Sequence, residues 1–272
     1  MYSKSEIEEL FSIFAEHFLN LNKIDLRNSL ENELSENDSN KFSDSISELK
    51  TGKPFQQILG ETEFYGMKFF VNEHVLIPRP ETEELLEIAI QKVEDLRLKF
   101  AGLKILDIGT GSGIIPIVLK KYFPESEVSA IDISKEALEI ARKNTEFHQM
   151  KINFINKDYL NEVFSDQTDK EIYDVIISNP PYIGIEENPE IEDSVKGFEP
   201  NLALFSPNSD ALIFYRKIAE DCRNHLAENG LLFLEINQKL GKETLELYQE
   251  GFSEVELLKD ISGNDRMIFG RK

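Results

Sequence analysis

Residues 103–122 read LKILDIGTGSGIIPIVLKKY, and this stretch decides the fold. An apolar run at 103–108 leads into a glycine-rich turn at 109–113, and a second apolar run follows at 114–122. Glycines let the backbone turn at positive φ, and an unbroken apolar run is typical of a parallel strand that is buried on both faces. The stretch therefore predicts a buried strand, a tight turn and a helix.

The same alternation of strands and helices continues towards the C-terminus. Further strands are predicted at 128–133, 152–155, 173–178 and 231–236, and helices at 135–147 and 212–226. The segments 255–258 and 267–269 predict a closing pair of strands. This pattern predicts a doubly wound α/β domain of the Rossmann type, with a mostly parallel sheet of seven strands.

The N-terminal part of the chain predicts a small helical unit. Apolar residues between Ile7 and Leu21 recur at helical spacing, and Ser5 with Glu8 has the spacing of a capping box. A short second helix is predicted around Leu26 and a third helical piece around Ile46 and Leu49, whereas the polar stretch 35–44 between them predicts a loop. The predicted parts of the chain are a helical domain at 1–60, a β-hairpin linker at 61–80 and an α/β domain at 81–272.

Charge and cysteine content exclude several classes of protein. The chain has 272 residues, with 30 Lys and Arg against 51 Asp and Glu, so its net charge is −21. Such a body repels phosphate backbones, and direct binding to nucleic acid is not expected. Cys222 is the only cysteine and the four histidines are scattered, so neither a disulfide nor a metal site is predicted.

The sequence also predicts where the protein works. Its first ten residues, MYSKSEIEEL, lack the apolar core of a secretory signal. No apolar run approaches the roughly 18 residues that cross a bilayer. We therefore expect a cytoplasmic protein without a membrane segment.

The glycine-rich turn predicts a nucleoside-binding site. Ile114 stands where a dinucleotide fingerprint needs its third glycine, and the Gly-Lys-Ser/Thr of a P-loop is absent, so a ligand without pyrophosphate is favoured. Asp132 ends the next strand, 25 residues after Asp107, where a carboxylate can accept both ribose hydroxyls. Asp158 and Tyr159 follow the third strand and offer a carboxylate and a flat ring to a base. The predicted cofactor-binding residues are Gly109, Thr110, Gly111, Ser112, Gly113, Asp132, Asp158, Tyr159 and Asn179.

A second motif, Asn179-Pro180-Pro181-Tyr182, follows the fourth predicted strand. The two prolines end the strand and stiffen the loop before a substrate arrives. The Asn179 side-chain oxygen and the Pro180 carbonyl can accept hydrogen bonds from both N–H groups of a planar amino group. These bonds would aim its nitrogen at an electrophile and stabilise the positive charge that develops on it. Tyr182 can pack on the planar face of the substrate. The motif predicts Asn179, Pro180 and Tyr182 as catalytic residues and all four residues as substrate-binding.

Each motif also has a purely structural interpretation. The glycine-rich turn can be an ordinary strand-to-helix connection, in which Thr110 and Ser112 only cap the helix. The double-proline loop can be a rigid turn with its tyrosine as a hydrophobic plug. Glu235 is either a substrate contact or a hydrogen-bonding group behind the site, and Arg79 and Arg266 are either site cations or members of structural ion pairs. The functional interpretation is favoured because three successive strand ends place suitable groups along one crevice.

Several stretches resemble the bacterial peptide chain release factor glutamine methyltransferases, which are S-adenosylmethionine (SAM)-dependent enzymes of the Rossmann-like superfamily. The stretches are 76–83 (LIPRPETE), 107–113 (DIGTGSG), 178–183 (SNPPYI), 198–200 (FEP) and 263–266 (GNDR). The resemblance extends from about residue 53 to residue 271. The first stretch is the most discriminating, because many methyltransferases share the glycine-rich turn but few carry this proline-flanked segment.

The resemblance implies a specific reaction, the transfer of a methyl group from SAM to the glutamine amide in the Gly-Gly-Gln loop of release factors. It implies that SAM contacts fall on 109–113, Asp132, Tyr159 and Asn179, and that substrate contacts fall on 179–182. It also implies that the helical N-terminal domain docks the release factor. A monomer is expected, with no nucleic acid or membrane as partner.

Two other functions fit part of the pattern. Adenine presents the same planar amino group, so an adenine amino-group methyltransferase acting on DNA or RNA is the nearest alternative. Such an enzyme should carry a basic track, which this acidic chain lacks. A non-catalytic SAM-binding adaptor would bind SAM without turnover. The interpretation that accounts for both motifs is a SAM-dependent protein-glutamine N-methyltransferase.

Overall fold

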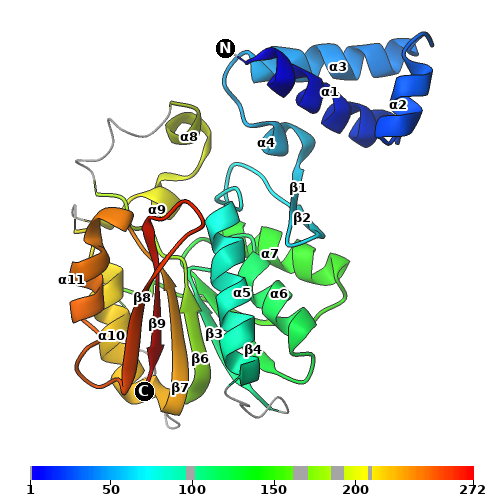
Figure 1. Cartoon of the computed structure of the whole chain (residues 1–272). Helices are drawn as coiled ribbons and strands as arrows, with labels where there is room; N and C mark the ends of the chain where they lie inside the picture. Colours follow the sequence, from blue (N-terminus) through cyan, green and yellow to red (C-terminus); the bar gives the residue numbers. More distant parts are fainter. Residues whose placement is uncertain (1, 96–101, 162–170, 185–192, 208–209) are drawn as a thin grey trace.

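The structure is a computed structural model that describes residues 2–95, 102–161, 171–184, 193–207 and 210–272. A small helical unit, an antiparallel hairpin and an α/β body follow one another along the chain (Figure 1). The helical unit consists of α1 (Lys4–Leu19), α2 (Lys23–Ser29), α3 (Glu36–Leu49) and α4 (Phe55–Leu59). The hairpin consists of β1 (Glu61–Phe64) and β2 (Met67–Phe70).

The start of α1 differs from its sequence prediction by two residues. The capping box is formed by Ser3 and Glu6, not by Ser5 and Glu8. Glu6 N donates to Ser3 Oγ at 3.3 Å, and Ser3 N donates to Glu6 Oε2 at 2.6 Å. Both pairs have the same three-residue spacing, so spacing alone does not tell which serine precedes the first helical turn.

The polar stretch 35–44 is helical, so the loop that its composition predicts is wrong. Ser35 caps α3 by accepting a hydrogen bond from Asp38 N at 3.1 Å. Most of the polar residues that follow lie on the exposed face of the helix. Phe42, within the stretch, packs edge-on against Phe18 of α1 with ring centroids 5.5 Å apart. A single well-placed aromatic residue therefore helps to dock a helix that is otherwise mostly polar.

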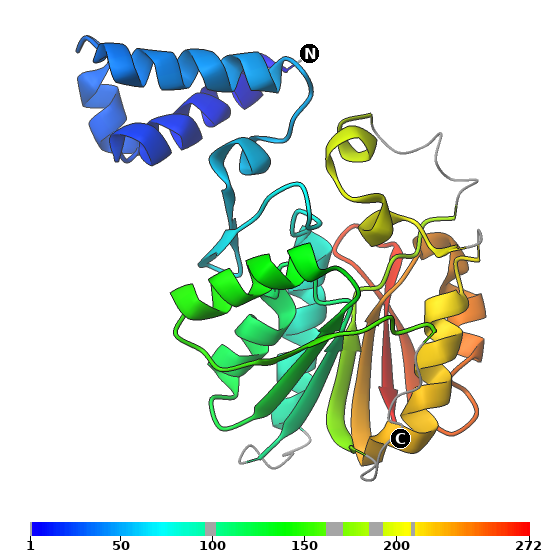
Figure 2. The ribbon, with the colours of Figure 1, turned by 180° about the vertical axis from the view of Figure 1, so that it is seen from behind.

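The body is a sheet covered by helices on both faces (Figures 1 and 2). Its strands are β3 (Lys104–Ile108), β4 (Glu127–Asp132), β5 (Asn153–Asn156), β6 (Tyr173–Ser178), β7 (Leu226–Glu235), β8 (Glu254–Lys259) and β9 (Asp265–Arg271). Its helices are α5 (Pro80–Asp95), α6 (Ile114–Tyr122), α7 (Lys135–Phe147), α8 (Asp193–Phe198), α9 (Asn201–Leu204), α10 (Ile213–His225), the 3-10 helix η3 (Gln238–Leu240) and α11 (Gly241–Glu246). None of the helices in the described part of the chain combines the length and apolar character of a bilayer span.

Within the described residues, seven strands form the sheet in the order β5-β4-β3-β6-β7-β9-β8. The first five strands in this order run parallel to one another; for example, Leu106 of β3 pairs with Ser129 of β4 and with Ile176 of β6. β9 is antiparallel to both β7 and β8. The predicted mostly parallel seven-stranded sheet is therefore confirmed. The strand order reverses between β3 and β6, which is where open α/β sheets bind ligands.

Alternate residues of the central strands enter two separate cores. Val175 and Ile177 of β6 belong to the core that α5 and α6 cover. Ile176, which points to the other face, belongs to the core that α10 covers. Because both faces are buried, the strand is apolar at each of these positions.

The hairpin carries the chain from the helical unit to the ends of the strands. Tyr65 and Gly66, at its turn, have φ of 53° and 64°, as a two-residue type I′ connection requires. After β2, Val71 and Val75 pack against Ala137 of α7. This contact holds the following residues at the end of the sheet where the strand order reverses.

Candidate active site

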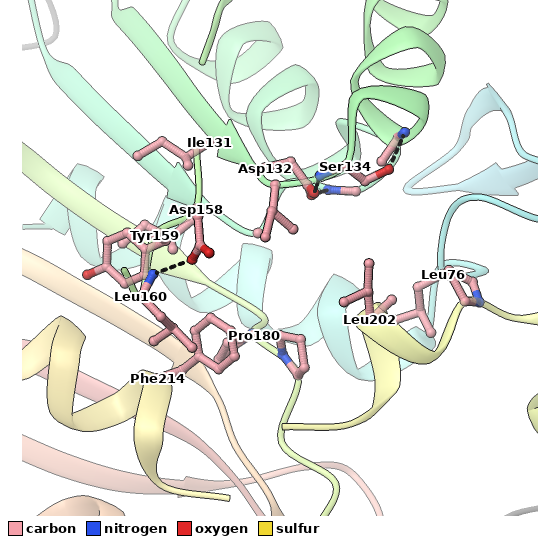
Figure 3. A pocket seen from close by; sticks show the side chains of 18 of the residues that line it. Leu76, Ile131, Asp132, Ser134, Asp158, Tyr159, Leu160, Pro180, Leu202 and Phe214 are labelled. Carbon is pink, nitrogen blue, oxygen red and sulfur yellow. Dashed lines mark hydrogen bonds between the residues drawn. The ribbon is translucent and has the colours of Figure 1, made fainter. Parts of the chain in front are cut away.

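A cavity of about 360 Å³ lies at the carboxyl ends of the parallel strands (Figure 3). Four consecutive strands contribute predicted site residues to its wall: Gly109 and Gly111 after β3, Asp132 of β4, Asp158 and Tyr159 after β5, and Asn179, Pro180 and Pro181 after β6. Leu76, Leu202 and Phe214 complete other parts of the wall. The structure thus brings most of the predicted site residues to one cavity.

Asp132 holds the glycine-rich turn against the end of β4. Gly111 N donates to its Oδ2 at 2.8 Å, and Ser134 N donates to its Oδ1 at 2.9 Å. Burial raises the pKa of Asp132, and the Ser134 and Gly111 N–H groups oppose this shift. A carboxylate oxygen can accept more than one hydrogen bond, so Asp132 can still receive ribose hydroxyls from the cavity.

Three residues of the predicted turn lie behind the wall. Thr110, Ser112 and Gly113 are not among the described residues that line the cavity. Gly113 has φ of 80°, and a Cβ there would lie 3.0 Å from the Cβ of Ala141 in α7. The Ser112 carbonyl accepts a hydrogen bond from Asn144 Nδ2 at 2.8 Å. These contacts favour a role in packing the turn on α7.

Asp107 is a buried carboxylate directly behind the turn. Neither of its carboxylate oxygens has a hydrogen-bond partner of normal geometry among the described residues. Burial raises the pKa of Asp107 to about 7, while the neighbouring Thr110 hydroxyl lowers it and the charge of Asp132 raises it. A nearby positive charge stabilises such a carboxylate. The site therefore suits a cationic ligand.

Asp158 and Tyr159 shape the cavity beside β5. Asp158 Oδ1 accepts hydrogen bonds from Leu160 N and Asn161 N, both at 3.2 Å; Figure 3 shows the first of them. Tyr159 is buried and packs in the core beside α10. Burial, with the adjacent Asp221, raises the pKa of the Tyr159 hydroxyl well above its usual value. The pair offers an acidic group and a fixed ring, as the sequence predicts.

Asn179 is linked to two residues that the sequence analysis does not connect with it. Its Nδ2 donates to Thr82 Oγ1 at 3.1 Å, and Thr82 Oγ1 donates to Glu235 Oε2 at 2.7 Å. Burial raises the pKa of Glu235 to about 7, although the Thr82 hydrogen bond and the charge of Arg266 lower it. Thr82 is a site residue that sequence reasoning missed. The signal that could have found it is its place within the discriminating stretch 76–83.

Tyr182, at the other end of the double-proline loop, is not among the described residues that line the cavity. Its hydroxyl donates to Glu235 Oε1 at 3.2 Å, and its carbonyl accepts from Asn237 Nδ2 at 3.1 Å. Glu235 therefore occupies the position of a hydrogen-bonding group behind the site, which is one of its two sequence interpretations. Stacking of Tyr182 on a substrate stays a prediction.

The two arginines singled out in the sequence form ion pairs. Arg79 Nη2 lies 2.5 Å from Glu199 Oε1, and the other oxygen of this carboxylate accepts from Ile77 N at 2.9 Å. Arg266 Nε lies 3.1 Å from Asp260 Oδ2. Both arginines thus have the structural role that one interpretation predicts.

Among the described residues, no group of three or more His, Cys, Asp or Glu side chains could hold a metal ion.

The sheet order, the strand-end cavity and the glycine-rich turn define a Rossmann-like methyltransferase. Residues 89–193 match the family described as Methyltransferase small domain, and residues 4–60 match the PrmC N-terminal domain. The crystal structure of a methyltransferase from Pyrococcus furiosus aligns with a TM-score of 0.54 over 85% of this chain and 99% of that chain. Because only 18% of residues are identical, this likeness supports the fold alone.

Curated relatives narrow the class to one family. The chain is 46% identical to the release factor glutamine methyltransferase of Flavobacterium psychrophilum, over 98% of this chain and 93% of the relative. It is 42% identical to that of Lactococcus lactis subsp. lactis, over 91% and 88%. The chain belongs to the release factor glutamine methyltransferase family, and its cofactor is SAM. The family resemblance of the sequence motifs is confirmed.

Proposed function

We propose that this enzyme methylates the side-chain amide nitrogen of the glutamine in the Gly-Gly-Gln loop of peptide chain release factors. The observation that carries the proposal is the meeting of the glycine-rich turn, Asp132 and Asn179 at one cavity. The names of the relatives supply the substrate class, because both are release factor glutamine methyltransferases. The net charge of −21 gives no support to the adenine alternative on DNA or RNA.

The residues around the cavity fit SAM. Asp132 would accept the ribose hydroxyls, and Asp158 with Tyr159 would lie beside the adenine. Gly111, without a side chain, lets the ligand approach the backbone. The buried carboxylate of Asp107 complements a positively charged ligand. When bound, SAM supplies an electrophilic methyl group on a positively charged sulfur.

The contribution of the double-proline loop to catalysis is positioning. The amide nitrogen of glutamine is a poor nucleophile, because its lone pair is delocalised into the carbonyl group. Asn179 Oδ1 and the Pro180 carbonyl accept hydrogen bonds from its two N–H groups and orient the nitrogen towards the methyl group. Such orientation of reactants can contribute roughly 7–11 kcal/mol. The same two acceptors stabilise positive charge on the nitrogen. As the N–C bond forms, the bond between the methyl group and the sulfur of SAM would break, the sulfur would leave as a neutral thioether, and one N–H proton would leave to solvent.

We further propose that the parts of the chain divide the work. Residues 1–60 would dock the release factor, 61–80 would link, and 81–272 would bind SAM and perform the reaction. The match of residues 4–60 to the PrmC N-terminal domain supports a distinct helical part. The enzyme would act as a monomer in the cytoplasm, where translation is terminated. Light scattering after gel filtration tests this state, and a dimer at assay concentration would contradict it.

The decisive experiment for the proposed function uses labelled SAM and two versions of one release factor. The first version carries the natural Gly-Gly-Gln loop, and the second carries Gln→Ala at the loop glutamine. We expect one methyl group on the glutamine amide of the first version and none on the second, as mapped by mass spectrometry. Label on both versions, or on neither, would contradict the proposal.

A further inference from the structure

Asn179 is supported from behind by two buried side chains. Thr82 belongs to α5 and Glu235 ends β7, and their exposed fractions are 2% and 1%. Neither is among the described residues that line the cavity. Elements that are far apart in the sequence thus meet behind a single amide.

The hydrogen bonds of this group have a fixed direction. Thr82 Oγ1 donates its one proton to Glu235 Oε2 at 2.7 Å, and when Glu235 is ionised its carboxylate can only accept, which fixes this direction. Thr82 Oγ1 then offers only lone pairs to Asn179, whose Nδ2 donates to it at 3.1 Å. The reverse orientation of the amide would place the Asn179 oxygen against the Thr82 oxygen with no proton between them. The amide oxygen is therefore the end directed away from Thr82.

The same carboxylate also holds the other end of the double-proline loop. Tyr182 donates its hydroxyl proton to Glu235 Oε1 at 3.2 Å. Asn179 and Tyr182 flank the two prolines, so Glu235 restrains one end of the loop through Thr82 and the other end directly. Turning Tyr182 away would deprive the buried Glu235 carboxylate of a hydrogen bond, and turning the Asn179 amide would deprive the buried Thr82 oxygen of one. Both losses are unfavourable.

We propose that Thr82 and Glu235 are positioning residues that hold the Asn179 carbonyl oxygen towards the substrate and thereby select a group with N–H donors. The inference rests on the proposed function, because those donors are the N–H groups of a glutamine amide. An Asn179 amide that had turned around would set its own N–H groups against those of the substrate. The substrate nitrogen would then lose the alignment on which transfer depends.

Thr82→Val tests the inference, because valine has nearly the shape of threonine but no hydroxyl. We expect kcat to fall about 10- to 100-fold, since small errors in alignment cost this much. The Kd for SAM and the KM for the release factor should stay within about threefold of wild type. Thr82→Ser restores the hydroxyl and should recover most of kcat. The matched control is Thr145→Val, which removes a buried hydroxyl that bonds Ala141 O at 2.7 Å within α7 and should leave all three constants unchanged.

A double-mutant cycle with Asn179→Ala separates positioning from a general structural role. If Thr82 acts through Asn179, adding Thr82→Val to Asn179→Ala costs no further activity in single-turnover assays. The inference is overturned if the double variant loses the same factor again, if Thr82→Val keeps the wild-type kcat, or if it weakens SAM binding in parallel with kcat. A wild-type enzyme that leaves the Gly-Gly-Gln glutamine unmethylated would instead overturn the proposed function, so the two failures are distinguishable.

Discussion

At the scale of single residues, Asp132 combines two tasks in one carboxylate. It accepts the N–H groups of Gly111 and Ser134, and it lines the cavity. Asp132→Ala removes the acceptor for the ribose hydroxyls and releases the glycine-rich turn. Because hydrogen bonds to a charged group contribute about 1.5–3 kcal/mol, we expect the Kd for SAM to rise about 10- to 100-fold in isothermal titration.

The control for this change is Ser134→Ala, two residues away. Ser134 Oγ caps α7 by accepting from Ala137 N at 3.0 Å, so its loss weakens the helix start by about 1 kcal/mol. It leaves the Asp132 carboxylate in place, and the Kd for SAM should stay within about threefold of wild type. If both variants weakened SAM binding equally, Asp132 would act only through the local backbone.

Asp107 is expected to make stability depend on pH. Burial raises the pKa of this carboxyl from 3.8 to about 7. The folded protein therefore holds the proton more tightly than the unfolded chain, so stability from this group is complete below the unfolded pKa and is lost as the pH rises through the folded pKa. Between those values, wild type should lose up to about 1.4 kcal/mol per pH unit relative to Asp107→Asn. Urea unfolding of both proteins from about pH 5 to 8 measures the difference, and a constant difference would contradict the prediction.

Site residues that follow strands could be predicted from the sequence, whereas Thr82 could not. Carboxyl ends of parallel strands meet at one edge, so the strand pattern alone places Asp132 and Asn179 near each other. Thr82 precedes Asn179 by 97 residues and Glu235 by 153. No periodic pattern connects positions on a helix, a loop and a strand end, because their contact depends on how the layers pack.

At the scale of elements, the contact between the glycine-rich turn and α7 depends on Gly113. Its φ of 80° and the 3.0 Å that separate a Cβ from Ala141 Cβ both oppose a side chain. Gly113→Ala should lower the free energy of unfolding by about 1–3 kcal/mol beyond the cost of the positive φ alone, because a well-packed contact resists an added methyl group. The measurement is urea unfolding at fixed pH, with SAM affinity as a second readout for displacement of the turn.

Gly102→Ala provides the matched control for backbone strain. Gly102 also has a positive φ, 74°, but no heavy atom lies within 4 Å of a Cβ built there. Gly102→Ala should lower the free energy of unfolding by only the cost of the left-handed backbone conformation, about 1–2 kcal/mol, and should leave SAM affinity unchanged. If the two variants lost equal stability and affinity, the contact with α7 would not be the reason for glycine at 113.

The elements differ in how far local sequence determines them. The helix predicted at 135–147 matches α7 (Lys135–Phe147), because a serine cap precedes an amphipathic pattern. The last residues of α3, around Ile46 and Leu49, are predicted as helical, but its first part escapes prediction because its residues are mostly polar. The docking of that part depends on Phe42, which meets Phe18 only in the folded unit. Tertiary contact supplied what the composition of this stretch did not indicate.

At the scale of the whole molecule, the segment 198–200 connects parts that are distant in the sequence. Glu199, with a side chain only 1% exposed, binds Ile77 N and Arg79. The neighbouring Phe198 carbonyl accepts from Gln57 Nε2 of α4 at 2.8 Å. The helical unit, the chain after the hairpin and the α8–α9 region are therefore joined at one place. Leu76, in the chain after the hairpin, and Leu202, in α9, both line the cavity.

Glu199→Ala should therefore loosen the cavity. The change leaves Ile77 N without an acceptor and Arg79 without its partner, so the walls on either side can separate. Because Glu199 is the buried member of this ion pair and also the acceptor for Ile77 N, its loss should displace the cavity wall, and we expect the Kd for SAM to rise about tenfold. Gln57→Ala is the control, since it cuts only the neighbouring bond to α4 and should leave the Kd for SAM within about threefold of wild type. The two titrations decide the matter: an unchanged Kd for Glu199→Ala, or an equal rise for both variants, would show that this carboxylate does not hold the cavity closed.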